Sequence, residues 1–370
     1  MEKKGIGYHH VDASVNAYGG GYNYSNDPFS GKRTYWQPNV RPHPQDGTLT
    51  PVPITLSEKK FPVVPDAQDC GIFCDDALEG KPSQQYAYVG PKRANKPGSD
   101  RAIIFPNEVP NVELAYLLIN PERHYSSIAD STDPELENMA DTLYNFLRAV
   151  QANEDGYFDD VYDVAFSINN GVLSGGSVEH FHINLHFLRR ETDPDFVTKQ
   201  VRQKERELGG RYNQYQYETG NGAHIVANLD HEGASIYTPT NATGDNQLTV
   251  ALGPGKSALN EMTQGDLLTL LKGLRLSAQT IRNLHGGIPY HMHGRIPFDE
   301  KDAGTSPVRI KQDPLFGNVG NPVCDASIGN KISRAPWVTA RELRNVLDSG
   351  VQNGTIAPIG TADPSTSLSR

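Results

Sequence analysis

Polar and apolar residues alternate strictly over residues 180 to 187. The polar positions are His180, His182, Asn184 and His186, and the apolar positions are Phe181, Ile183, Leu185 and Phe187. Because successive side chains of a β-strand point to opposite faces, this pattern predicts a strand with one apolar and one polar face. Four nitrogen-bearing side chains in a row need hydrogen-bond partners once they are even partly buried. We therefore favour a ligand-binding or catalytic face over a strand of plain surface residues.

The spacing of this row limits the chemistry that it can perform. Neighbouring side chains on one face of a strand lie roughly 6.6 Å apart, so His180 and His186 are separated by about 20 Å. One metal ion cannot bind all four groups, although two of them could share one. An extended ligand such as a phosphate chain fits the row better. Directly upstream, Gly175, Gly176 and Ser177 form a loop whose backbone N–H groups can approach an anion closely.

The composition of the chain narrows the classes of protein that it can be. The 370 residues include three cysteines and carry a formal net charge of −10. An odd and small number of cysteines argues against a disulfide scaffold, and we expect a cytoplasmic protein without a signal peptide or membrane span. The acidic balance makes a nucleic acid polymer a poor partner, because such binding depends on neutralising phosphates. A small phosphorylated ligand at a local site remains compatible with it.

The elements that would position the histidine row follow a pattern that recurs along the chain. Strands are expected at 102–107, 112–119 and 162–169, and a helix capped by Asp133 with Pro134 in its first turn is expected before the third of these. A further strand at 246–252 precedes a capping box at Thr263 and Asp266 and a second amphipathic helix. Residues 300–333 read as loops and 339–347 as a short helix. The recurrence suggests a degenerate internal duplication.

Several of these motifs together resemble a known family. The run from His180 to Leu185 resembles the histidine-triad signature, in which histidines alternate with apolar residues. Asn170-Gly171 and the positions of Gly175 and Ser177 resemble the galactose-1-phosphate uridylyltransferase branch in residue type and spacing. The segments 105–110, 121–124 and 289–294 are also similar to that branch. The resemblance covers roughly residues 100 to 300.

The resemblance implies a mechanism and a set of site residues. In this branch the middle histidine of the triad attacks the α-phosphorus of a nucleotide and forms a covalent nucleotidyl-histidine, and here that residue is His182. His180 and Asn184 are the other triad positions. The expected substrate contacts are Asn107, Asn170, Gly175, Gly176, Ser177 and His186. The partners implied are a nucleotide or nucleotide-sugar and a phosphate-bearing acceptor, and members of the branch often form homodimers.

The third position of the triad departs from both common versions of the signature. It is histidine in typical hydrolases and glutamine in the uridylyltransferase, whereas this chain has Asn184. An amide can donate a hydrogen bond to a phosphate but cannot supply a proton. This difference favours a transferase or phosphorylase over a hydrolase.

Some members of the branch also bind structural zinc, and the resemblance implies a similar ligand set here. Cys70, Cys74, His124 and His180 occupy similar places, although the three residues between the cysteines depart from the usual spacing. Without zinc, His180 would orient the phosphate or the nucleophile. His291 and His293 read either as polar groups on a loop or as a second metal site. No organic cofactor is expected.

The resulting expectation is an α+β fold of two related histidine-triad-like halves, with antiparallel sheets and helices packed on one face. An extended N-terminal arm would span 1–65, the first half 66–230, the second half 231–333, and a short helix with a mobile tail 334–370. Two functional alternatives stay open at this point. One is a metal-dependent enzyme that uses His180 and His182 as ligands, and the other is a non-catalytic nucleotide-binding protein.

Overall fold

The structure is a computed structural model, and the side chains that it describes lie mainly between residues 102 and 356. Backbone and side chains are described over 102–105, 114–121, 123–154, 156, 158–171, 174, 180–189, 218–220, 222–240, 242, 246–303, 306–314 and 336–356. The backbone alone is described for the strand segments 8–11, 22–26, 33–36, 40–42, 49–51, 88–89, 106 and 330–332. Among the described helices, none combines the length and apolarity that a membrane span requires.

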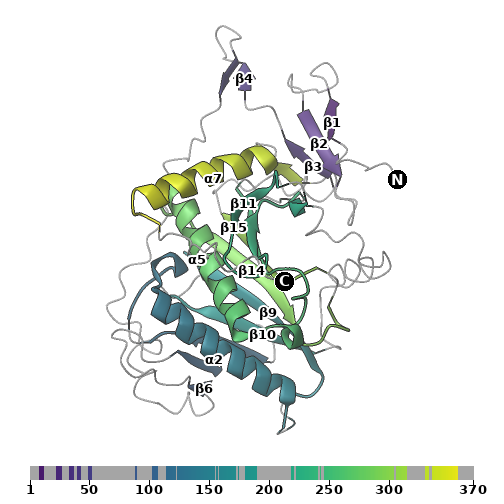
Figure 1. Ribbon diagram of the computed structural model, residues 1–370, viewed down its shortest axis with the longest axis vertical. Helices are drawn as coiled ribbons and strands as arrows, with labels where there is room; N and C mark the ends of the chain where they lie inside the picture. Colours follow the sequence, from purple (N-terminus) through teal and green to yellow (C-terminus); the bar gives the residue numbers. More distant parts are fainter. Residues whose placement is uncertain are drawn as a thin grey trace, which may run out of the picture.

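A ten-stranded antiparallel sheet forms the centre of the fold, in the order β11-β12-β13-β15-β14-β9-β10-β8-β7-β6 (Figure 1). Its strands are β6 Tyr88–Val89, β7 Ile103–Pro106, β8 Leu114–Ile119, β9 Val161–Asn170, β10 Ile183–Arg189, β11 Ile225–Asn228, β12 Ser235–Tyr237, β13 Leu248–Ala251, β14 Tyr290–Pro297 and β15 Arg309–Pro314. With the helices described below, the sheet makes a mixed α/β fold, which is the general class that the sequence predicts.

The strand order contains the same connectivity twice. In the group β6-β7-β8-β10-β9, the helix α2 follows the third strand, and the fifth strand lies between the third and the fourth. The group β11-β12-β13-β15-β14 has the same arrangement, with the helix α5 after its third strand. The fourth strands of the two groups, β9 and β14, pair with each other and join the groups into one sheet.

The two long helices begin with the same type of cap. The helix α2 spans Asp133–Ala152 and α5 spans Gln264–His285. Thr132 caps α2 in a capping box with Glu135, one residue before the cap predicted from the sequence, so that Asp133 is already helical. The side chain of Glu135 accepts from the backbone N–H of Thr132, and the side chain of Thr132 accepts from the backbone N–H of Glu135. A helix capped by Asp133 would not form this reciprocal pair of bonds. The capping box predicted for α5 at Thr263 is confirmed.

Both helices pack on one face of the sheet and bury its apolar side (Figure 1). On β9 and β10 that side carries the buried residues Val164, Phe166, Ile168, Ile183, Leu185 and Phe187. They pack in one core with the apolar stripes of the helices. Because side chains alternate along a strand, the polar residues between them face the opposite side of the sheet.

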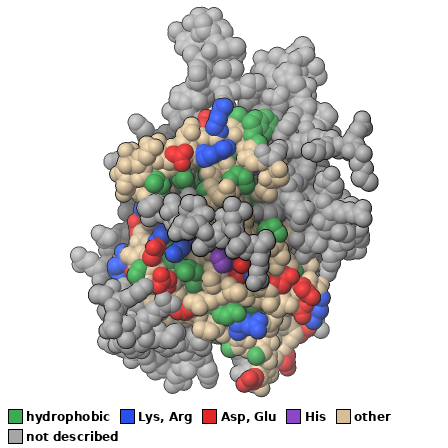
Figure 2. All heavy atoms as spheres, in the orientation of Figure 1, with side chains coloured by type: hydrophobic (Ala, Val, Ile, Leu, Met, Phe, Trp, Pro, Cys, Tyr) green, Lys and Arg blue, Asp and Glu red, His purple; other side chains and the backbone are tan. Residues whose placement is uncertain are grey.

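Charged side chains of both signs are mixed over the described part of the face seen in Figure 2. Two of the ion pairs connect α5 to the start of α2 and to the short 3-10 helix η4, Ile128–Asp130. Arg275 lies 2.5 Å from Asp133, and Arg282 lies 2.6 Å from Asp130. Such exposed pairs contribute little to stability one by one. Their effect here is to fix the position of α5 beside the first group of strands.

Several sequence-based assignments of elements are wrong. Residues 300–333 contain β15 and also β16 (Asn330–Ile332), and the C-terminal helix α7 is longer than expected, Pro336–Gln352. The N-terminal arm contains β1 Tyr8–Val11, β2 Tyr22–Asn26, β3 Arg33–Trp36, β4 Val40–Pro42 and β5 Leu49–Pro51. β16 joins the sheet β1-β2-β3 by pairing with β3, which no local pattern reveals. The hairpin β11–β12 spans residue 230, and the predicted division of the chain into halves stays a prediction.

His224 makes the stability of the fold depend on pH. Its side chain is buried, and burial lowers the pKa of the imidazole although the carbonyl of Thr238 partly offsets this. The unfolded chain, with a pKa of about 6.5, therefore binds a proton at a pH where the folded protein does not. The contribution of the neutral His224 side chain to the free energy of unfolding is therefore complete above a pH of about 6.5. It is lost as the pH falls below that value, with a slope of up to about 1.4 kcal/mol per pH unit.

We expect the variant His224→Gln to lose less stability on acidification than the wild type. Urea unfolding at pH 7.5 and 5.5 measures this, and the wild type should lose about 1 kcal/mol more than the variant over that interval. An equal loss in both proteins would show that His224 does not titrate differently in the folded and unfolded states.

Candidate active site

The histidine motif begins in a loop and continues into β10. The strand starts at Ile183, not at His180 as predicted, because the backbone at Phe181 bonds outside the sheet. The N–H of Phe181 donates to the carbonyl of Tyr125 at 2.6 Å, and the two rings stack with centroids 5.5 Å apart. The segment 120–125, which follows β8, therefore holds the start of the motif.

The ring of His182 has a defined tautomer. Its Nδ1 is 2.8 Å from the backbone carbonyl of His180. Since a carbonyl can only accept, Nδ1 carries the ring proton and the lone pair of the neutral ring is on Nε2. Burial lowers the pKa of His182, and the bond to the carbonyl of His180 offsets this in part. The half-buried ring is thus kept neutral near pH 7, as a nitrogen nucleophile requires.

His180 is fully buried. Its Nε2 is 3.1 Å from the carbonyl of Asn120, so this nitrogen carries the proton and Nδ1 has the lone pair. Burial, followed by smaller effects of the neighbouring histidines, lowers its pKa to about 4 despite that bond. The ring of His124 meets it edge to face, with centroids 5.2 Å apart. A neutral imidazole with one N–H fixed by a carbonyl is the form in which histidine binds a metal, so this pair fits a shared zinc ion.

Asn184 and His186 continue the polar face along β10. The amide of Asn184 donates to the carbonyl of Ser167 on β9 at 3.4 Å, which orients it across the strand pair. His186 is half-buried and lies opposite Ala165 on β9. Burial lowers the pKa of His186. Asn170 ends β9 and is followed by Gly171 at φ +84°, whose left-handed conformation turns the chain towards the histidine loop.

The second pair of histidines belongs to the same face of the sheet. His291 and His293 lie on the strand β14 and not on a loop, and their rings stack with centroids 5.1 Å apart. Asn184 pairs with Ser167, and Ser167 pairs with His293, so these three residues form one row across three strands. Nδ1 of His293 is 3.4 Å from a carboxylate oxygen of Asp313 on β15. Sequence analysis did not identify Asp313, because residues 309–314 have too few apolar positions to indicate a strand.

Six predicted site residues lie outside the described residues. They are Cys70, Cys74, Asn107, Gly175, Gly176 and Ser177. The structure therefore brings together His124, His180 and His182, with the carbonyls that hold the second and third of these, and places Asn184 and His186 further along the motif on β10. The proposed zinc ligands and phosphate contacts outside the described residues stay predictions.

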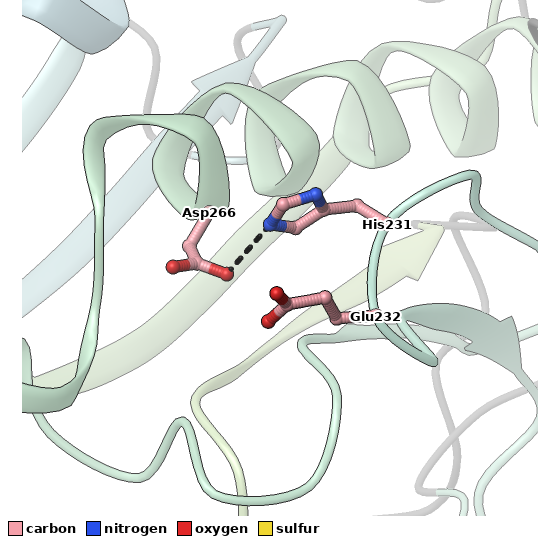
Figure 3. Close-up of side chains that lie close together, drawn as sticks. All are labelled: His231, Glu232 and Asp266. Carbon is pink, nitrogen blue, oxygen red and sulfur yellow. Dashed lines mark hydrogen bonds and ion pairs between the residues drawn. The ribbon is translucent and has the colours of Figure 1, made fainter. Parts of the chain in front are cut away.

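A separate group of side chains near the start of α5 has the composition of a metal site. His231, Glu232 and Asp266 offer ligand atoms within 4.8 Å of one another (Figure 3). However, Nζ of Lys256 lies 3.3 Å from Glu232 and 3.2 Å from Asp266. Burial alone would raise the pKa of Asp266, but hydrogen bonds from Thr263 and Lys256 outweigh it and lower the pKa. A side-chain cation is thus already held between the two carboxylates, and a metal would have to displace it.

Comparison with known proteins identifies the fold. No protein-family model matches the sequence, and no curated protein matches it. Among solved structures, an ADP-glucose phosphorylase from Arabidopsis thaliana with bound ADP-glucose superposes with a TM-score of 0.60 and 13% identity, covering 87% of this chain and 98% of that one. A GalT-like protein from the same plant gives 0.59 and 15%, with 87% and 98% covered. A uridylyltransferase mutant gives 0.59 and 14%, with 88% and 99% covered.

The chain therefore shares the fold of this phosphorylase, this GalT-like protein and this uridylyltransferase. The likeness agrees with the resemblance of the sequence to a uridylyltransferase branch. At identities of 13–15% this likeness establishes the fold and leaves the reaction to be argued from the site.

Proposed function

We propose that the protein is a nucleotidyltransferase or nucleotide phosphorylase that transfers a nucleoside monophosphate through a covalent intermediate on His182. The observation that carries this proposal is the hydrogen bond from Nδ1 of His182 to the carbonyl of His180, which leaves the lone pair on Nε2. A half-buried neutral imidazole with a fixed tautomer is suited to attack phosphorus.

The reaction would proceed in two displacements. Nε2 of His182 attacks the α-phosphorus of the donor, a P–N bond forms, and the bond from that phosphorus to the bridging oxygen breaks. The leaving group departs as a sugar phosphate or a nucleoside polyphosphate, and the imidazolium charge is stabilised by the carbonyl of His180. An acceptor phosphate oxygen then attacks the same phosphorus, and the P–N bond breaks to restore neutral His182.

The rest of the polar face supports a donor with a phosphate leaving group. Asn184 can donate to a phosphate oxygen but cannot protonate a leaving group. A phosphate leaving group needs no such proton, which favours nucleotide-sugar or dinucleotide donors. We place Asn170 and His186, together with Asn107, Gly175, Gly176 and Ser177, on the substrate. The ADP-glucose phosphorylase of the same fold was solved with ADP-glucose, so this nucleotide-sugar is the first donor to test.

We also propose that the two groups of strands are related halves and that zinc binds Cys70, Cys74, His124 and His180. The repeated strand order and the matching capping boxes at residues 132–135 and 263–266 support the first proposal. The buried, neutral imidazole of His180 and the ring of His124 beside it support the second. Metal analysis of the purified protein should find one zinc that His124→Ala loses, and an unchanged zinc content would refute this ligand set. A homodimer and a cytoplasmic location stay predictions.

The function is tested by intact-protein mass spectrometry without an acceptor. The protein is incubated separately with ADP-glucose, UDP-glucose, a GDP-sugar and a dinucleoside polyphosphate. We expect a mass gain of one nucleoside monophosphate with at least one donor, because the second displacement cannot occur. The mass of the adduct identifies the base, and phosphate or a sugar phosphate should remove it.

The two alternatives give different results in the same experiment. Turnover that vanishes with chelator and returns with metal, without any adduct, would replace the proposal with a metal-dependent reaction at His180 and His182. Nucleotide binding with neither adduct nor turnover would replace it with a non-catalytic binding protein.

A further inference from the structure

We propose that Arg123, held by Glu135, is a positioning residue for the nucleophile His182, an inference that rests on the proposed function. Arg123 lies in the segment 120–125 after β8, and Glu135 lies in the first turn of α2. Neither residue belongs to the predicted triad, the phosphate loop or the zinc ligands. Their role follows from a continuous series of contacts that runs from the start of α2 to the ring of His182.

The first step is a two-point ion pair. Nε of Arg123 donates to Oε1 of Glu135 at 2.7 Å, and Nη2 donates to Oε2 at 2.6 Å. Nη2 also donates to the backbone carbonyl of Asp130 at 2.8 Å. Glu135 has only 1% of its side chain exposed and is itself fixed in the capping box of α2. This fork geometry fixes the plane of the guanidinium as well as its position, which a lysine could not do.

The second step holds the loop against the helix. The guanidinium of Arg123 lies over the ring of Tyr125, 4.4 Å from its centroid. The side-chain amide of Asn120 donates to the hydroxyl of Tyr125 at 3.2 Å and to the backbone carbonyl of Glu135 at 3.3 Å. Both ends of the segment 120–125 are therefore anchored to the start of α2.

The third step passes from this loop to the nucleophile. The carbonyl of Asn120 accepts from His180, and the carbonyl of Tyr125 accepts from the N–H of Phe181. These bonds fix both residues that precede His182. The carbonyl of His180 in turn sets the tautomer and direction of the His182 ring. A shift of the segment 120–125 would therefore move the carbonyl of His180, which holds the ring of His182 in place.

The second group of strands contains a matched ion pair without a nucleophile. Lys256, in the loop after β13, lies 3.2 Å from Asp266, which has 1% of its side chain exposed and occupies the same place in the capping box of α5 as Glu135 does in α2. The carbonyl of Lys256 accepts from the N–H of Val308 just before β15, as that of Tyr125 does from Phe181 before β10. Lys256 is therefore a natural control for loss of a cation beside a buried capping carboxylate.

The experiment compares Arg123→Met, Arg123→Lys and Lys256→Met with the wild type as full-length proteins. The rate of adduct formation is measured in single turnovers at saturating ADP-glucose or whichever donor forms the adduct, together with the Kd for that nucleoside monophosphate and the melting temperature.

Both methionine variants should lose similar thermal stability. Arg123→Met should lower the adduct rate by about 10²-fold, since a displacement near 1 Å costs that much, while its Kd changes little. Arg123→Lys should be intermediate, and Lys256→Met should retain the rate within about twofold, because the contacts of Lys256 described above lead to α5 and to the start of β15.

A rate loss in Lys256→Met equal to that in Arg123→Met would overturn the proposal, as would an unchanged rate in Arg123→Met. Long-range proton–nitrogen NMR of the histidine rings gives an independent reading. Arg123→Met should disturb the tautomers of His180 and His182 while Lys256→Met leaves them as in the wild type. If the wild type forms no adduct, the proposed function fails, and these spectra still decide whether Arg123 positions the ring. Unchanged spectra in Arg123→Met would refute the positioning role by themselves.

Discussion

Replacing His182 with alanine is expected to abolish adduct formation and to lower turnover by about 10⁴-fold or more, the size of loss seen when a covalent nucleophile is removed. The reason is that His182 is a neutral histidine with a fixed tautomer that is only half-buried, and no other described side chain of this site has both properties. His180 is fully buried, and its Nε2–H group donates a hydrogen bond to the carbonyl of Asn120. The nucleotide should still bind, because the backbone and amide contacts of the site remain.

His186→Ala is the matched control for this prediction. It removes a half-buried histidine four residues further along the same motif, and burial lowers the pKa of both imidazoles. We expect this variant to retain adduct formation and to change mainly the KM for the donor. The measurement is single-turnover adduct formation by mass spectrometry, with the Kd for the nucleoside monophosphate as a test of folding. Adduct formation by His182→Ala would show that the nucleophile is another residue.

Replacing Phe166 with alanine is expected to have the largest effect on stability, a loss of about 3–5 kcal/mol in the free energy of unfolding. Phe166 lies in the middle of β9 with 1% of its surface exposed. It pairs with Leu185 on β10, the strand that follows His182, and with Gly294 on β14. Since Gly294 has no side chain to fill a gap and Ile310 is already packed over it, the cavity can close only in part.

Phe158→Ala tests whether this loss comes from the central position of Phe166. Phe158 is partly buried and packs on the same core beside Phe146 and Phe187. Its removal should cost less, because solvent already reaches part of the ring. Urea unfolding measures both variants. Equal losses would mean that the junction between β9 and β14 is no more tightly packed than the edge of the core.

Local patterns predicted much of what surrounds the site. The alternation after residue 180 placed Asn184 and His186 on one face of β10, and the capping box of α5 was found at Thr263 from four residues of sequence. Side-chain periodicity and capping depend on neighbours within a few positions, so a single sequence contains them. The cap of α2 was misplaced by one residue because both Thr132 and Asp133 are good caps, and the capping box that Thr132 forms with Glu135 decides between them.

Contacts between distant segments could not be predicted in this way. The strand β15 has too few apolar residues to be recognised, and it exists because β13 and β14 pair with it on both sides. For the same reason His291 and His293 were assigned to a loop, whereas pairing with β9 places them on the face of the nucleophile. Arg123 and Glu135 are separated by twelve positions, and no spacing rule connects a loop residue to a helix cap.

The sequence by itself indicated the type of fold, because the alternating histidines and the repeated strand and helix signals are local properties of the chain, and its resemblance to a known family indicated the nucleophile candidate. Only the tertiary structure decided how the candidates differ. His180 and His182 are equivalent by spacing, yet the first ring is fully buried with Nε2 on the carbonyl of Asn120, and the second is half-buried with Nδ1 on the carbonyl of His180. Folding brings the carbonyl of Asn120 from a distant segment, whereas that of His180 lies two residues from the ring it holds, and these carbonyls determine which nitrogen of each ring is available for chemistry.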